Sequence, residues 1–218
     1  MGMTQVRNGL GLIRSDEGRR GLSQAARTRL HSRREAIGLC RDLSVPFAVP
    51  PAKIPLVVRP LRPDDELSFI ADDPDVEPEL AQARLRQRWL LTADLPTCWI
   101  AVDPDGMACY MQWLIASSEN DRIRAWWGGL FPELEPGEAL LEGAYTSDSH
   151  RGKGIMSHAM ARIAEHAADF GANKVITFVG TENIASLKGC ERAGFAPYIE
   201  RTDSWSLFRR HVIFRPLS

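Results

Sequence analysis

The feature that most constrains the fold is the stretch of residues 140–168, which reads as a strand, a glycine turn and a helix. An apolar run of strand length, residues 140–146, ends in a short polar turn that leads into residues 151–154 (RGKG). From Ile155 onward, apolar residues recur at spacings of three and four, which predicts a helix with one apolar face. Gly171 follows where such a helix would end.

The glycine turn is typical of an anion-binding site. The first amides of a helix have no partner inside the helix, and the helix dipole places partial positive charge at that end. Gly152 and Gly154 lack the Cβ atoms that would hold a phosphate away from the backbone, and Arg151 and Lys153 add charge. Because several amides converge within one turn, a diphosphate suits the turn better than a single carboxylate. Neither the P-loop pattern nor the dinucleotide fingerprint is completed here.

Two segments carry a family resemblance. The pattern R-x-x-G-x-[G/A] after a strand resembles the acetyl-coenzyme A loop of the GNAT superfamily of N-acetyltransferases, although Met156 stands where the family usually has a small residue. Residues 183–195 (NIASLKGCERAGF) resemble the family's segment N-x-x-S-x-x-x-[Y]-E-K-x-G-F. The resemblance extends over about residues 54–215 and leaves roughly the first 50 residues outside it.

The resemblance implies the GNAT fold, an α/β architecture with a mixed, mostly antiparallel sheet of six to seven strands and helices on both faces. The residue patterns agree with this order of elements. Residues 118–137 are expected to be an irregular insert. Strands are predicted at residues 54–61, 97–102, 107–115, 140–146, 174–179, from 194 and at 205–214, and helices at 64–71, 80–91, 155–170 and after 181.

The expected domain organisation is a basic N-terminal extension, residues 1–52, followed by an acyltransferase domain, residues 53–218. Residues 23–39 contain helix formers, and four prolines in residues 43–55 indicate an extended linker. Residues 1–62 hold 12 Lys and Arg against 4 Asp and Glu, a net charge of +8. Such an arm suits an acidic partner, but it has almost no aromatic residues to stack on bases, so nucleic-acid binding is not expected.

Composition favours a cytoplasmic protein with no membrane partner. No apolar run approaches the roughly 20 residues of a membrane span, and no secretory signal is visible. The four cysteines are scattered without a C-x-x-C pair, which predicts reduced thiols and neither a disulfide framework nor a metal site. Homodimerisation is left open.

The resemblance also implies where acetyl-CoA would bind. Two parallel strands are expected to splay apart, and backbone groups of the central strand would lie beside the pantetheine arm and the thioester. The glycine turn would hold the pyrophosphate, and the start of the following helix would contact the coenzyme. The residues implied are Ala144, Tyr145, Thr146, Arg151, Gly152, Lys153, Gly154, Ile155, Met156, Asn183 and Ser186.

Acetyl transfer to an amine needs a proton acceptor, and Glu142 is the first candidate. It is the only carboxylate in residues 140–146, so a strand would bury it in part and raise its pKa. The alternative is a solvent-exposed glutamate at a strand end, with Glu138 as the reserve base. Many relatives carry a carboxylate or histidine at this offset from the turn.

Cys190 stands where the family often places a tyrosine as general acid, and a thiol is able to protonate a leaving thiolate. The alternative is a small buried hydrophobic residue on the apolar face of its helix. In that case Tyr145 or Tyr198 would replace the phenol, or the thiolate would leave unaided.

The acceptor site is expected to border the acidic loop, residues 72–79, and the Trp126-Trp127 pair, which together would suit a cationic amine. The predicted function is an acetyl-CoA-dependent N-acetyltransferase that moves the acetyl group directly to a primary amine of a small molecule or an amino sugar. Two alternatives stay open. One is a catalytically weak or inactive acyl-CoA-binding regulatory module, and the other is a protein or peptide N-acetyltransferase.

Overall fold

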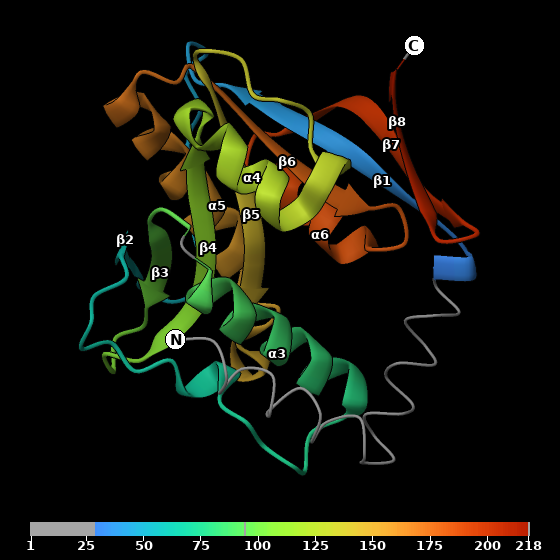
Figure 1. Ribbon diagram of the computed structural model, residues 1–218. Coiled ribbons are helices and arrows are strands. Elements are labelled where there is room, and N and C mark those ends of the chain that lie inside the picture. The colour runs from blue at the N-terminus through green and yellow to red at the C-terminus, as the bar shows by residue number, and fades with distance from the viewer. Residues whose placement is uncertain (1–28, 94, 218) are drawn as a thin grey trace, which may run out of the picture.

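The computed structural model describes residues 29–93 and 95–217, and the described strands form one sheet in the order β2-β3-β4-β5-β6-β1-β7-β8 (Figure 1). Only β5 and β6 are parallel, and every other neighbouring pair is antiparallel. The strands are β1 (His31–Asp42), β2 (Val57–Pro60), β3 (Cys98–Val102), β4 (Ala108–Ala116), β5 (Glu138–Thr146), β6 (Lys174–Gly180), β7 (Ala196–Ser206) and β8 (Arg209–Pro216). The α-helices are α3 (Pro78–Thr92), α4 (Asn120–Trp127), α5 (Ile155–Glu165) and α6 (Ile184–Arg192).

Helices cover both faces of the sheet, as the GNAT fold requires. On one face, α3 and α4 pack over a core that includes Leu90, Ile123 and Trp113 (Figure 1). On the other face, α5 buries its apolar side, including Met160 and Ile163, and α6 contributes Cys190 to the same core. The predicted mixed, mostly antiparallel α/β fold is therefore confirmed.

The largest difference from the sequence prediction lies at the start of the described chain. Residues 31–39 were predicted to be helical, but they belong to β1, which lies between β6 and β7 and pairs with both. The helix prediction was wrong because the slot between two strands, which buries Ala36 and Leu39, outweighs the helix propensity of Arg, Glu and Ala. With β1 the described sheet has eight strands, one more than the predicted maximum of seven. The proposed domain boundary between residues 52 and 53 stays a prediction.

Three other elements differ from their predictions. The insert at residues 118–137 is not irregular throughout, because it contains α4. The predicted strand at residues 205–214 is interrupted by a hairpin turn at Leu207 and Phe208, which adopt positive φ angles of 47° and 65°. The predicted short helix at residues 64–71 is only a 3-10 turn, η1 (Ser68–Ile70).

The site is positioned by an irregularity in β5. The register between β4 and β5 shifts at Gly143, which has a φ of 70°. A Cβ atom at residue 143 would lie 2.7 Å from Cε3 of Trp113, so both the conformation and the close approach require glycine. β5 pairs with β6 over three residues only, from Glu138 to Leu140. Beyond Leu140 the two parallel strands diverge, as the resemblance implied, and leave backbone groups of β5 unpaired on that side.

Candidate active site

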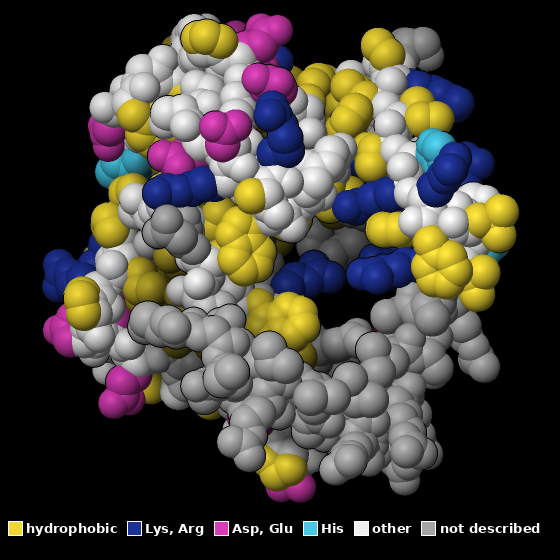
Figure 2. Space-filling view, in the orientation of Figure 1, with side chains coloured by type: hydrophobic (Ala, Val, Ile, Leu, Met, Phe, Trp, Pro, Cys, Tyr) yellow, Lys and Arg dark blue, Asp and Glu magenta, His cyan; other side chains and the backbone are white. Residues whose placement is uncertain are grey.

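A cavity of about 1280 Å³ opens where β5 and β6 diverge. Its walls come from the end of β5, the glycine turn with the start of α5, the start of α6, and one side of α3. Figure 2 shows a hollow above α3 that is bordered by Lys and Arg side chains. Parts of the chain that are distant in sequence therefore meet around one open space of a size suited to a large ligand.

The glycine turn presents a row of free amides to this cavity. Among the described residues, the six consecutive N–H groups from Gly152 to Ser157 donate no hydrogen bond to any backbone or side-chain acceptor. Gly152 and Gly154 have positive φ angles of 74° and 75°, and a Cβ at residue 152 would meet no atom within 4 Å. Adjacent free amides at a helix N-terminus, with glycines in the left-handed region, form a concave anion site. The turn therefore fits the pyrophosphate of an acyl-CoA.

A lysine from the proline-rich segment adds positive charge beside this turn. The backbone N–H of Lys53 donates to Lys153 O at 2.8 Å, and its side chain lines the cavity. The segment is held in place by the ring Nδ1 of His158, which lies 2.9 Å from Pro50 O. Sequence analysis treated Lys53 as the start of the acyltransferase domain and assigned it no role, because nothing in the sequence shows that residues 50–55 lie across the turn.

Most of the predicted coenzyme residues meet at this cavity. Lys153 is not among the lining residues, although its carbonyl accepts from Lys53. The start of α6 is fixed by Asn183, whose side-chain oxygen accepts from the backbone N–H of Ser186 at 3.1 Å. The predicted residues that line the cavity are Ala144, Tyr145, Thr146, Arg151, Gly152, Gly154, Ile155, Met156, Asn183 and Ser186.

Glu142 lies on β5 just before the bulge at Gly143 and opposite Trp113 in the register of β4. Its side chain is half-buried on the α3 side of the sheet. Burial raises the pKa of Glu142 above its ordinary value, and the nearby charges of Arg86 and Arg201 counteract this only in part. Glu142 is not among the cavity-lining residues, although Ala144, two residues further along β5, is. A half-buried carboxylate with a raised pKa is chemically suited to be a general base.

Glu138, the second candidate for the general base, already has hydrogen-bond partners. Glu138 lies at the start of β5, and its carboxylate accepts from Lys174 Nζ at 2.8 Å and from the backbone N–H of Glu135 at 3.0 Å. Glu138 is not among the cavity-lining residues. These contacts make it a structural ion pair at the far end of the strand.

Cys190 lies inside the core and does not line the cavity. Its side chain is 1 % exposed, and burial raises the pKa of the thiol to about 12. It belongs to the apolar cluster beneath α5, which agrees with the alternative of a small buried hydrophobic residue. A role for Cys190 as proton donor stays a prediction that this geometry does not favour.

Tyr145 does line the cavity, and its ring stacks on Phe69 with centroids 5.9 Å apart. Its hydroxyl is buried beside the Arg84 guanidinium, which interacts with it and favours the ionised phenol in part. Burial raises the pKa of this phenol. Of the two tyrosines that sequence analysis considered in place of Cys190, only Tyr145 lines the cavity.

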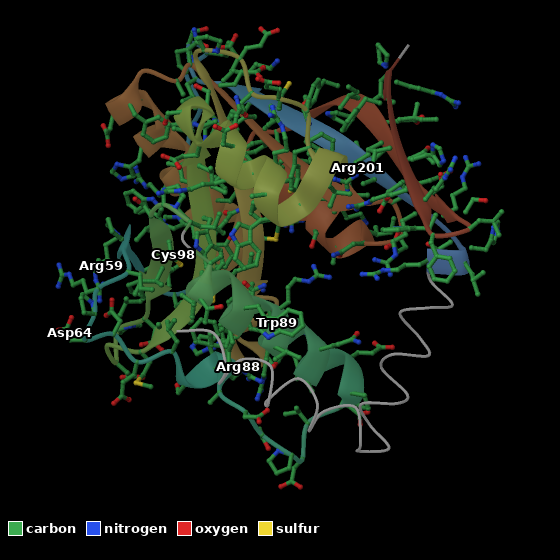
Figure 3. The ribbon with its side chains drawn as sticks, in the orientation of Figure 1. Arg59, Asp64, Arg88, Trp89, Cys98 and Arg201 are labelled. Carbon is green, nitrogen blue, oxygen red and sulfur yellow. The ribbon has the colours of Figure 1, made fainter. Side chains whose placement is uncertain are left out.

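The acidic loop does not form the expected rim. Asp72 pairs with Arg88 at 3.2 Å and Asp73 with Arg84 at 3.7 Å, so α3 neutralises two of its charges. Of residues 72–79, only Glu79 lines the cavity, and neither Trp126 nor Trp127 does. The tryptophan that lines the cavity is instead Trp89, which is 62 % exposed and is labelled on α3 in Figure 3.

Sequence analysis missed the whole contribution of α3. The cavity-lining residues of this helix recur at helical spacing, but they are mostly polar, so the helix pattern alone gave no reason to select them. Arg192 and Lys188 of α6 were missed for the same reason. The α3 residues that line the cavity are Glu79, Gln82, Ala83, Leu85, Arg86, Gln87 and Trp89.

Comparison with known proteins identifies the domain. Residues 55–196 match the family described as an acetyltransferase (GNAT) domain, which is more than half of the 218 residues. No protein with a curated description matches the chain significantly. Among the described residues, no helix is both long and apolar enough to cross a membrane.

Solved structures share the fold at low sequence identity. A glucosamine N-acetyltransferase region of a fungal multi-domain β-N-acetylglucosaminidase is 15% identical with a TM-score of 0.54, and the match covers 88% of this chain and 23% of that one. A GCN5-related N-acetyltransferase from Sphaerobacter thermophilus is 14% identical with a TM-score of 0.50, covering 93% and 56%. A GNAT-family acetyltransferase from Colwellia psychrerythraea is 12% identical with a TM-score of 0.49, covering 93% and 63%. The chain therefore spans less than two thirds of the length of these relatives.

Proposed function

The chain belongs to the GNAT acetyltransferase family, and we propose that it transfers the acetyl group of acetyl-CoA directly to a primary amine of a small molecule. The observation that carries this proposal is the row of six free amides from Gly152 to Ser157 at the edge of the cavity. A site built from backbone amides and cationic side chains suits the phosphates of the acyl donor. The unpaired edge of β5, where Ala144, Tyr145 and Thr146 line the cavity, suits its pantetheine arm.

The reaction needs an uncharged amine next to the thioester. The amine nitrogen forms the new C–N bond with the acetyl carbon, the C–S bond breaks, and the coenzyme leaves as a thiol once it has gained a proton. Glu142 takes the proton that an ammonium acceptor must lose before attack, either directly or through one water molecule. Its raised pKa makes the carboxylate a stronger base than an ordinary surface glutamate.

Protonation of the leaving thiolate is the step for which the cavity offers the fewest suitable side chains. Among the described residues, Tyr145 is the only tyrosine that lines the cavity, and its hydroxyl lies beside the Arg84 guanidinium. The proton released by the amine is chemically sufficient to balance the thiolate, so no further donor is required. No metal and no covalent intermediate on the protein enters this scheme.

The test measures the release of free coenzyme A thiol from acetyl-CoA against a panel of primary amines, amino sugars and peptides. The proposal expects turnover with small amines, and a loss of turnover in Glu142→Gln without a loss of coenzyme binding. Turnover confined to peptide N-termini or protein lysines would replace the small-molecule acceptor with a protein. Tight acetyl-CoA binding without turnover on any amine would favour the regulatory module.

A further inference from the structure

A buried amide on α3 faces the cavity without a hydrogen bond. Gln87 is 4 % exposed and lines the cavity, yet its Oε1 atom has no partner among the described residues. No other hydrogen bond of this side chain occurs there either. Buried polar groups are nearly always paired, and leaving one unpaired costs about 1–3 kcal/mol. The Oε1 atom itself has almost no solvent-accessible surface, so a small shift of the amide toward the cavity would let a bound ligand donate to it.

The position of Gln87 favours the amine of the acceptor substrate as the group that donates a hydrogen bond to it. Gln87 and Glu142 are both on the α3 side of the sheet, and the Arg86 charge is close enough to influence the Glu142 carboxylate. The cavity at this end is also lined by Tyr145 of β5, whose buried hydroxyl lies beside the Arg84 guanidinium. An amine has N–H groups to donate, so Gln87 is placed to orient it while Glu142 removes its proton.

Arg86 differs from the other two arginines of α3. Arg84 pairs with Asp148 at 3.4 Å and Arg88 with Asp72 at 3.2 Å, whereas Arg86 forms no salt bridge in the described part of the chain and interacts with Glu142 only at longer range. Arg86 nevertheless lines the cavity, where Glu79 is the only acidic lining residue. A guanidinium that forms no direct ion pair is able to bind an anionic group of a ligand, and carboxylates fit its planar fork.

We propose that Gln87 and Arg86 form the acceptor subsite and that the acceptor is a primary amine bearing a carboxylate, such as an amino acid. Gln87 Oε1 accepts a hydrogen bond from the amine, and Arg86 binds the carboxylate. Both are positioning residues that leave proton removal to Glu142. This inference rests on the proposed acetyltransferase function and narrows the acceptor from amines in general to one class.

The experiment compares matched acceptors in the full chain with saturating acetyl-CoA. Each amino acid, with its amine in the α, β or γ position, is tested beside its own amide, which keeps the amine and loses the charge. The wild-type protein should have a kcat/KM about 5- to 10-fold higher for the acid than for the amide. Arg86→Gln should abolish this preference, and Arg86→Lys should restore part of it. Arg88→Gln, on the same helix but away from the cavity, should keep it.

Gln87→Met tests the second contact with nearly the same side-chain volume. It should raise the acceptor KM about 5-fold and leave the acetyl-CoA dissociation constant and the melting temperature unchanged, because no native hydrogen bond is lost. A weakened acetyl-CoA affinity would overturn the assignment, because Gln87 would then accept its hydrogen bond from the pantetheine arm and not from the amine. Equal rates for acids and amides in the wild type, or an acid preference that survives Arg86→Gln, would overturn the acceptor class while the acetyltransferase function stands. Failure to bind acetyl-CoA at all would instead contradict the proposed function.

Discussion

The two ends of the cavity are built in different ways. At the proposed coenzyme end, recognition would come largely from the backbone amides of one contiguous segment, residues 152–157, with glycine at two positions. At the proposed acceptor end, it would come from side chains of separate elements, with Gln87 and Arg86 of α3 lining the cavity and Glu142 of β5 within electrostatic range of Arg86. The coenzyme end therefore depends on local chain conformation, whereas the acceptor end depends on how a helix packs on a sheet.

A site made of backbone amides and a site made of side chains respond differently to amino-acid substitution. A backbone site tolerates changes of side chain as long as the glycines keep their conformation, so it suits a ligand that many proteins share. A side-chain site changes with single substitutions on one helix face, so it suits an acceptor that differs from one enzyme to another. Substitutions at the two ends should accordingly affect different steps.

Gly154→Glu should have the largest effect, at the coenzyme end. Residue 154 has a φ of 75°, and an added Cβ would lie 3.5 Å from Pro51 O. The new side chain would strain the turn and place a negative charge where a diphosphate is expected. Acetyl-CoA affinity should fall by about 10²- to 10³-fold in calorimetric titration.

The matched control is Gly129→Glu, which adds the same charge at an exposed residue with an ordinary φ of -82° and no atom within 4 Å of the added Cβ. Its coenzyme affinity should equal that of the wild type. An unchanged affinity in folded Gly154→Glu would remove the turn from the coenzyme site.

Glu142→Gln should separate chemistry from binding at the acceptor end. It should lower kcat/KM by about 10²-fold, while the coenzyme dissociation constant stays the same. Because the base must be ionised, wild-type kcat/KM should rise with pH through the Glu142 pKa, which burial places above its ordinary value. The variant should lack this rise, and a pH profile that keeps it would assign the base to another group.

The same substitution makes a prediction about stability. Burial raises the folded-state pKa of Glu142 above its unfolded value, so ionisation costs stability as the pH rises through that window. Gln, which does not ionise, removes this cost. At neutral pH the variant should melt at the same temperature or up to about 4 °C higher, which is the shift that ~1 kcal/mol produces in a chain of this size.

Lys53→Gln should have a smaller effect at the coenzyme end. Lys53 reaches the turn from the proline-rich segment, and its ammonium is exposed, so its contribution should be screened by salt. Acetyl-CoA affinity should fall about 5-fold at low salt and less at high salt. The charge-matched control is Arg34→Gln on β1, which does not line the cavity. Equal losses in the two variants would mean that only net charge matters.

Cys190→Ala should have the smallest effect on the reaction. The thiol is buried in the core away from the cavity, so turnover should stay within about 2-fold of the wild type, with a stability loss of ~1 kcal/mol from the small void. A loss of activity without a loss of stability would restore the proton-donor role predicted from the family pattern.

The sequence brought most of the predicted coenzyme residues to one cavity for a physical reason, while their role in binding stays a prediction. The glycine turn, the strand before it and the helix after it are set by local conformation, so residues 140–170 carry their own structural signals. Ten of the predicted coenzyme residues line the cavity because they lie in two such segments. Lys153 does not line the cavity, since the direction of a side chain in a turn depends on backbone angles that a motif does not specify, and its predicted contact with the coenzyme stays a prediction.

The acceptor end and β1 could not be predicted in the same way. Gln87 and Arg86 become meaningful only when α3 lies beside β5, and that packing joins residues about 55 positions apart in the chain. β1 has a sequence compatible with a helix, and only the slot between β6 and β7 selects the strand. The prediction that the acidic loop borders the acceptor site did not account for packing either, because the arginines that neutralise two of its charges lie on α3.

The most direct test of the account follows the acetyl group itself. The protein is incubated with acetyl-CoA carrying a ¹³C-labelled acetyl group and an amino acid acceptor, and mass spectrometry locates the label on acceptor and protein. The account predicts one labelled acetyl on the amine for each coenzyme A released, none on the protein, and a rate that falls sharply in Glu142→Gln. Label that accumulates on the protein, or coenzyme binding without any labelled amine, would contradict direct transfer at this cavity.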